Sequence, residues 1–266
     1  METIYFVHGN GFPGMSYRKL FTRLKEYDYD VYALDKIGHK NSYPITQNWP
    51  FLVDELIEQI QTLAYPVIAV GHSMGGVLNL MASVRRPDLF KAVITLDSFF
   101  ISKLKLKMLH IAKYLGLIDY CTPGKRTKNR RVFWENEREM RQYFQSRAFF
   151  QQLDPECLED YIQYGVQRTK TGCSLTFDRE REYQIYATLP HDFSVFQQRN
   201  SALKVPGALI YGKQSEILSS ADIRSAEKLY HLRCFPIVGS HMFPLEHPIE
   251  TADKIHQVIE ILLMSN

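Results

Sequence analysis

Cysteine is scarce in this chain, and its pattern excludes two classes of protein. The 266 residues include only four cysteines, spaced widely and irregularly at Cys121, Cys157, Cys173 and Cys234. Such spacing fits neither a zinc site nor a disulfide scaffold. We therefore expect reduced thiols and no bound metal.

Long hydrophobic runs and strong net charge are also lacking. No apolar run approaches the ~20 residues that cross a bilayer, and no basic region with an apolar signal segment precedes the first predicted strand. The formal charge of +3 at pH 7 is too small to imply a nucleic-acid partner. We therefore expect a cytoplasmic protein with no stable membrane insertion.

Residues 66–76, Pro-Val-Ile-Ala-Val-Gly-His-Ser-Met-Gly-Gly, have the pattern of a strand, a sharp turn and the start of a helix. A serine at the tip of such a turn projects its Oγ above the sheet, and its neighbours must be nearly free of side chains. Gly71 and Gly75 meet that requirement. The turn also places the backbone N–H of Met74 at a helix N-terminus, where it can donate to an oxyanion. This stretch predicts Ser73 as a nucleophile.

A glycine-rich loop follows the first predicted strand. Residues 8–14, His-Gly-Asn-Gly-Phe-Pro-Gly, allow backbone N–H groups to approach a ligand closely. The N–H of Asn10 is the candidate for a second oxyanion donor, with Gly11 as the alternative. The simpler interpretation is a strand-to-helix turn without a catalytic role.

The order of predicted elements favours an α/β fold. Apolar, β-rich runs alternate with amphipathic stretches, which is typical of a parallel sheet covered by helices on both faces. Active residues in such sheets gather at the carboxyl ends of the strands, where His8, Ser73 and Asp97 all fall. The predicted strands span residues 3–7, 30–34, 67–70, 91–96, 207–211 and 232–238.

The alternation stops between residues 99 and 203. This segment has helix-like stretches but no convincing apolar strand, so we expect a helical cap, or lid, inserted into a core made of residues 1–98 and 204–266. The helix-like stretches are residues 101–115, 135–151, 155–167 and 179–187.

Lysine and arginine dominate residues 101–134, where Asp119 is the only acid. One interpretation is a solvated basic face. The other is an electropositive rim that attracts an anionic substrate or a phosphate-bearing carrier.

A second motif follows the last predicted strand, at residues 239–248, Gly-Ser-His-Met-Phe-Pro-Leu-Glu-His-Pro. Together with the His-Gly loop, the Gly-x-Ser-x-Gly turn and the inserted segment, it resembles the α/β-hydrolase superfamily, in particular the capped branch of small serine hydrolases and esterases. The resemblance covers the whole chain. It implies Ser73 as nucleophile, His241 as general base and the N–H groups of Met74 and Asn10 as oxyanion hole. A mostly parallel six-stranded sheet is expected, without the antiparallel strands that usually come first.

The triad acid departs from the superfamily pattern. The usual Gly-x-x-Asp after the penultimate strand reads Gly-Lys-Gln-Ser here, so Ser215 stands at the aspartate position. Two substitutes exist: Glu216, one residue further on, and Asp97, at the end of the strand after the nucleophile strand. We favour Asp97, because an aspartate at a strand's carboxyl end already lies in the active-site layer.

These features predict a hydrolase that cleaves esters or thioesters of small to medium acyl substrates without a cofactor. The same three residues also support a carbon–carbon hydrolase or a lyase, and the fold alone would suit a receptor. Basic and aromatic residues in the cap leave membrane-surface lipase action as a further hypothesis, although such aromatic residues more often pack a cap against the sheet. The sequence does not determine the oligomeric state.

Overall fold

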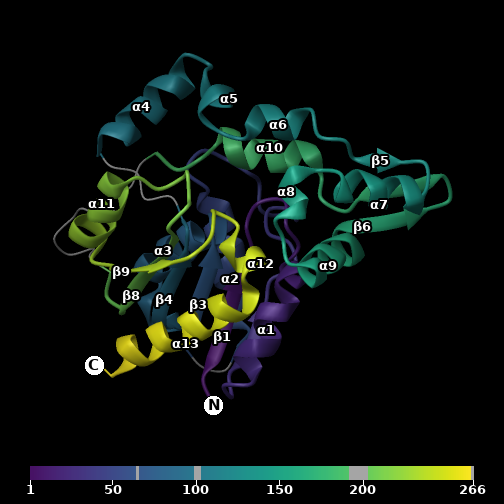
Figure 1. Cartoon of the computed structure of the whole chain (residues 1–266). Helices are drawn as coiled ribbons and strands as arrows, with labels where there is room; N and C mark the ends of the chain where they lie inside the picture. Colours follow the sequence, from purple (N-terminus) through teal and green to yellow (C-terminus); the bar gives the residue numbers. More distant parts are fainter. Residues whose placement is uncertain (64–65, 99–102, 192–202, 265–266) are drawn as a thin grey trace.

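Six parallel strands form the centre of the molecule, in the order β2-β1-β3-β4-β8-β9. The computed structural model describes residues 1–63, 66–98, 103–191 and 203–264. The six-stranded parallel sheet predicted from the sequence is confirmed (Figure 1). The strands are β1 (Thr3–Val7), β2 (Asp30–Ala33), β3 (Val67–His72), β4 (Phe90–Leu96), β8 (Gly207–Gly212) and β9 (Arg233–Ile237).

The register of the strands aligns their carboxyl ends. Val7 pairs with Gly71, and His72 pairs with Leu96, so β1, β3 and β4 finish side by side. Every residue of β3 is buried, as expected for a central strand covered on both faces. The loops that follow these three strands therefore begin at one edge of the sheet.

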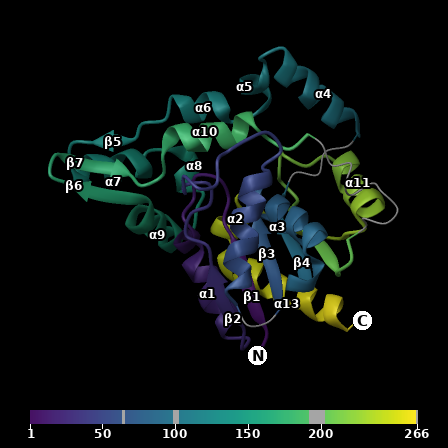
Figure 2. The same cartoon turned by 180° about the vertical axis from the view of Figure 1, so that it is seen from behind.

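Helices cover both faces of the sheet, as Figures 1 and 2 show from opposite sides. One face packs against the apolar sides of α1 and α13, and the other against α2, α3 and α11. Pro50 is the first residue of α2, a position where its missing N–H costs no helical hydrogen bond. The bounds are α1 (Arg18–Lys25), α2 (Pro50–Gln61), α3 (Met74–Arg85), α11 (Ser220–Tyr230), α12 (Phe243–Glu246) and α13 (Pro248–Leu263), with short 3-10 helices η1 (Gly14–Tyr17) and η2 (Pro87–Leu89).

The cap segment, residues 99–203, contains strands as well as helices, so the expectation of no strand there is wrong. Its three-stranded antiparallel sheet, in the order β5-β7-β6, packs around the fully buried Trp134. The strands are β5 (Phe133–Trp134), β6 (Val166–Thr169) and β7 (Gly172–Leu175). The helices are α4 (Lys103–Tyr114), α5 (Ile118–Cys121), α6 (Gly124–Lys128), α7 (Glu137–Gln145), α8 (Ala148–Gln151), α9 (Pro155–Gly165) and α10 (Arg179–Ala187).

Ion pairs join the cap segment to the first helix of the body. Arg18 of α1 contacts Asp160 in the middle of α9, and Lys19 contacts Asp154 just before that helix, each at 2.9 Å. In Figure 1, α5, α6 and α10 lie beyond the carboxyl ends of the strands. None of the helices in the described ranges combines the length and apolar composition needed to cross a bilayer.

Candidate active site

Ser73 lies at a strained turn between β3 and α3. Its φ of 53° and ψ of −113° are conformations that non-glycine residues rarely adopt. A Cβ on Gly75 would lie 2.1 Å from the carbonyl oxygen of Val7, and one on Gly71 would lie 2.4 Å from Gly75. Both glycines are therefore required by close backbone approach, as the sequence predicted. Met74, the first residue of α3, has its N–H in the turn where helices leave donors unpaired.

Asp97 and His241 meet beside this turn. Asp97 follows β4, is fully buried and accepts a hydrogen bond from the N–H of Gly212 at 2.9 Å. Its other carboxylate oxygen, Oδ2, lies 2.8 Å from Nδ1 of His241. A carboxylate can only accept, so His241 carries its proton on Nδ1 in the neutral state. The Nε2 atom is then free of a proton and can act as a base.

Ser215 also contacts the Asp97 carboxylate. Its Oγ donates to Oδ2 of Asp97 at 2.5 Å. The neighbouring Glu216, the alternative acid, is exposed. The structure thus brings His241 together with Asp97 rather than with Glu216. The sequence marked Ser215 only as a departure from the superfamily pattern, and its contact with Asp97 was not predicted.

A chain of buried hydrogen bonds connects the three loops of the site. Nε2 of His72 lies 2.9 Å from the carbonyl oxygen of His241, so it must carry the donated proton. Nδ1 then accepts from the hydroxyl of Tyr17 at 2.7 Å, and that hydroxyl accepts from the N–H of Gly9 at 3.3 Å. Burial holds the pKa of His72 well below its ordinary value. This role of Tyr17 was not predicted from the sequence, because no motif marks a tyrosine so far from His72 in the chain.

Removing the Tyr17 hydroxyl leaves two buried polar groups without a partner. Tyr17→Phe deprives His72 of its donor and Gly9 of its acceptor, and each unpaired group costs ~1–3 kcal/mol. We expect the free energy of unfolding to fall by about 2 kcal/mol or more, measured by urea denaturation. Tyr114→Phe, at an exposed position, should leave it unchanged. Equal stability of the two variants would contradict the hydrogen-bond chain.

His8, at the end of β1, is a second fully buried imidazole. Nδ1 donates to the carbonyl oxygen of Gly9 at 2.8 Å, and Nε2 accepts from the N–H of Ile37 at 3.1 Å. The ring is therefore neutral and positions the loop that follows. Burial lowers its pKa to about 4.

This burial predicts a pH-dependent stability. A histidine with a lowered folded pKa binds more protons when unfolded, so its stabilisation is present above the ordinary value of 6.5 and is lost as pH falls towards about 4. We expect the free energy of unfolding to fall over that window by up to ~1.4 kcal/mol per pH unit for each such histidine. Urea unfolding of wild type and His8→Asn measures this. The prediction would be contradicted by a wild-type stability that does not change across the window. It would also be contradicted by a His8→Asn variant whose stability falls as steeply as that of wild type.

The loop after β1 is covered by α10 of the cap segment. Nδ2 of Asn10 donates to the backbone oxygen of Glu182 at 3.0 Å. A Cβ on Gly11, whose φ is 80°, would lie only 2.6 Å from the Glu182 carboxylate. Burial raises the pKa of Glu182, and its ion-pair partner Arg130, at 2.5 Å, opposes that shift. The backbone of Asn10 and Gly11 is thus fixed between the body and the cap segment.

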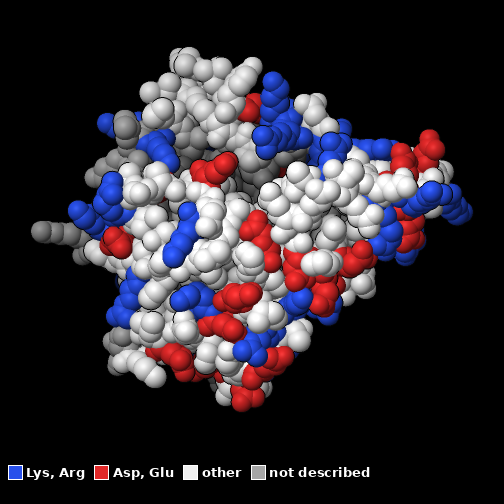
Figure 3. Space-filling view, in the orientation of Figure 1, with Lys and Arg blue, Asp and Glu red and all other residues white. Residues whose placement is uncertain are grey.

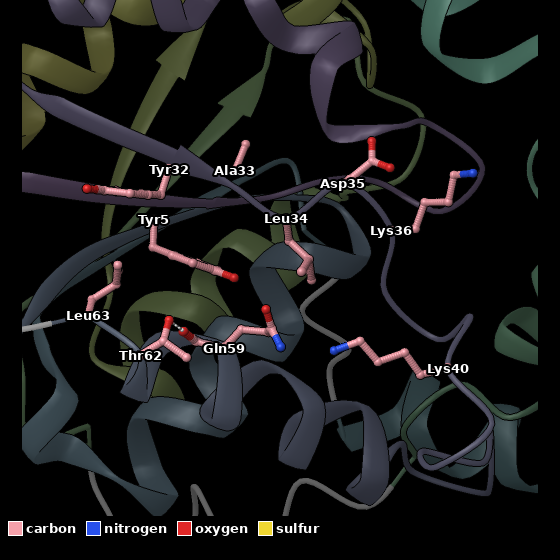
Figure 4. Close-up of a pocket in the computed structure, with 10 residues that line it drawn as sticks. All are labelled: Tyr5, Tyr32, Ala33, Leu34, Asp35, Lys36, Lys40, Gln59, Thr62 and Leu63. Carbon is pink, nitrogen blue, oxygen red and sulfur yellow. Dashed lines mark hydrogen bonds between the residues drawn. The ribbon is translucent and has the colours of Figure 1, made fainter.

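A hollow lies at the edge of the sheet, away from the residues described above. Among the described residues there is no cluster of three potential metal ligands. The hollow measures about 430 Å³ and lies between β2 and α2, where the Lys40 ammonium points across it towards Gln59 (Figure 4). Neither Ser73 nor Asp97 nor His241 lines it. We therefore do not place the substrate there.

The parallel sheet with a positive-φ serine at the end of β3 places this chain among the α/β hydrolases by fold. The model of the Alpha/beta hydrolase family matches residues 4–254, so the chain belongs to that family.

Individual relatives are distant. Monoglyceride lipase of Rattus norvegicus is 29% identical over 107 residues, which cover 37% of this chain and 35% of the lipase. The chain thus matches little more than a third of that relative's length. Among solved structures, an E-2-(acetamidomethylene)succinate hydrolase has a TM-score of 0.76 at 20% identity, covering 97% of this chain and 91% of that one. A thioesterase domain from the curacin biosynthetic pathway has a TM-score of 0.74 at 18% identity, covering 96% and 91%. Because both identities are low, these two comparisons show that the folds are similar and nothing more.

Proposed function

We propose that the protein is a serine hydrolase that cleaves ester or thioester bonds of small to medium acyl substrates through an acyl-Ser73 intermediate. The observation that carries this proposal is the 2.8 Å contact between His241 Nδ1 and Asp97, beside a serine held at positive φ. A serine hydroxyl is a weak nucleophile at neutral pH and needs such an oriented base.

The proposed reaction has two steps. His241 Nε2 removes the Ser73 hydroxyl proton as Oγ attacks the carbonyl carbon, and the N–H groups of Met74 and Asn10, or Gly11 in its place, stabilise the oxyanion. The C–O or C–S bond then breaks, and the imidazolium of His241 protonates the departing alcohol or thiol. Water, deprotonated by His241, attacks the acyl carbon, the bond to Ser73 Oγ breaks, and the His241 imidazolium returns its proton to Oγ as the acid leaves.

Two relatives support the choice of substrate bond. Monoglyceride lipase is named for an ester substrate, and the curacin domain for a thioester. We further propose that residues 99–203 act as a lid over the site, with residues 1–98 and 204–266 as the hydrolase core. The contacts of Glu182 with Asn10 and Gly11 support that division.

Labelling with a fluorophosphonate probe, followed by peptide mapping, tests for an activated serine. We expect a single modified peptide containing Ser73, together with turnover of p-nitrophenyl esters that shows an optimum between acetate and octanoate. Labelling without turnover of any ester or thioester would favour carbon–carbon hydrolysis. Neither labelling nor turnover by the folded protein would favour a receptor and overturn the proposal.

A further inference from the structure

Helix α4 presents an outward face of large apolar side chains. Leu106, Leu109 and Ala112 are buried beneath the helix, whereas Ile111 and Tyr114 on the opposite side are 55% and 87% exposed. The exposed apolar surface continues along the helix and into α5, and its other members are Met108, Leu115, Leu117 and Tyr120. Solvent-facing apolar residues are ordinary when scattered, but a continuous group of this kind marks an interaction surface.

Basic side chains surround this apolar face. Lys107 lies one helical turn from Ile111 on the same side of α4, and Lys125 lies over the ring of Tyr120, with its Nζ 5.4 Å from the ring centre. Arg126 is also exposed. The acid in this region, Asp119, is paired with Lys128 at 3.0 Å. Figure 3 shows lysine and arginine on both sides of the uncharged surface near α4 and α5.

We propose that the outward surface of α4 and α5 docks on the face of an anionic lipid bilayer. Apolar side chains flanked by lysine and tyrosine are what an interfacial helix requires, because the apolar groups enter the acyl boundary while the ammonium and phenol groups stay with the headgroups. An acidic protein would satisfy the lysines, but it would leave most of six large apolar side chains without an apolar counterpart. An anionic bilayer offers a counterpart to the lysines in its headgroups and to the apolar side chains in its acyl region.

The proposal goes beyond ester hydrolysis, since it concerns where the protein resides when it acts. The surface belongs to the same cap segment that contacts the Asn10 loop through Glu182. A substrate dissolved in a membrane would then be delivered to the side of the protein that carries the lid.

Sedimentation with lipid vesicles tests the docking surface. The Ser73→Ala protein, which cannot consume lipid esters by the proposed mechanism, is mixed with vesicles of phosphatidylcholine alone or of equal parts phosphatidylcholine and phosphatidylglycerol. We expect binding to the mixed vesicles at least tenfold tighter than to neutral ones, and weakened by salt. Ile111→Gln in the same background should reduce the partition coefficient roughly tenfold, as expected for one apolar side chain lost from the interface.

The matched control is Ile261→Gln. Ile261 is also partly exposed on a helix, but α13 lies on the opposite side of the molecule from α4 (Figure 1). It should bind vesicles as strongly as its parent. Equal binding of the two glutamine variants, or no preference for anionic vesicles, would overturn the proposal. So would a wild-type dimer that Ile111→Gln dissociates, because the surface would then be covered by a second copy.

Turnover of soluble esters tells the failure of the membrane-docking proposal from the failure of the catalytic proposal. With the Ser73 hydroxyl intact, Ile111→Gln should hydrolyse soluble p-nitrophenyl esters at the wild-type rate. Loss of vesicle binding with retained turnover is the expected outcome. Vesicle binding by a protein that hydrolyses no ester would refute the catalytic assignment alone.

Discussion

Ser73→Ala is expected to lower kcat for p-nitrophenyl ester hydrolysis by about a million-fold, the largest effect of any single substitution in this chain. Alanine removes the atom that attacks the carbonyl while leaving the turn and the backbone donors in place, so only catalysis by binding and the oxyanion site remains. The measurement is steady-state turnover together with probe labelling.

The control for this variant is a serine within α3, the helix that follows Ser73. Ser83 is buried and donates its hydroxyl proton to the carbonyl oxygen of Leu80, away from the turn. Ser83→Ala should keep kcat within a few-fold of wild type, at a modest cost in stability. A Ser73→Ala protein that retains a large part of the wild-type rate, or that is still labelled, would show that another residue is the nucleophile.

Asp97→Asn is expected to reduce kcat by about ten-thousandfold. The N–H of Gly212 donates to one oxygen of Asp97, so in asparagine the amide oxygen stays there and the NH2 group faces Nδ1 of His241. That NH2 group donates to Nδ1, which leaves the proton on Nε2, so the base has the wrong tautomer and the imidazolium is not stabilised. Glu216→Gln is the matched control, since it also replaces a carboxylate by an amide, at an exposed position one residue beyond Ser215. The reverse order of effects would assign the acid to Glu216.

The contact between Ser215 and Asp97 permits a stricter form of this experiment. Ser215 Oγ lies 2.5 Å from the oxygen that contacts His241, so an aspartate at position 215 would carry its carboxylate close to the imidazole. When Ser215→Asp is added to Asp97→Asn, the kcat of the double variant should be at least tenfold higher than that of Asp97→Asn alone. A double variant no more active than Asp97→Asn would show that the loop after β8 cannot present an acid to this histidine.

The sheet was predictable from the sequence because each of its strands is an apolar run with its own turn signal. Ser73 could be singled out for the same reason, since the glycines that its turn requires are adjacent in the chain. The cap strands lacked such signals. β5 has only two residues, Phe133 and Trp134, too few to show an alternating pattern. β6 continues directly from α9, so its first two residues fell within the helix predicted for residues 155–167.

The hydrogen bonds that hold the site together could not be predicted in this way. Tyr17 reaches His72 across 55 positions of sequence, and Ser215 reaches Asp97 across 118. Nothing local distinguishes these two hydroxyls from the others in the chain. Their roles emerge only when packing brings the loops together, because buried donors and acceptors must then find partners.

The shared contact of Ser215, Asp97 and His241 also bears on how this chain diverged from relatives that carry their acid after the penultimate strand. Asp97 and Ser215 follow the neighbouring strands β4 and β8, and the Ser215 hydroxyl donates to the same Asp97 oxygen that contacts the His241 imidazole. An ancestor with aspartate at both would have a duplicate acid, and either copy could be lost while the other stayed in service. Under the mechanism proposed above, the role of acid can therefore pass between the ends of two neighbouring strands by successive single substitutions, with activity kept at every stage.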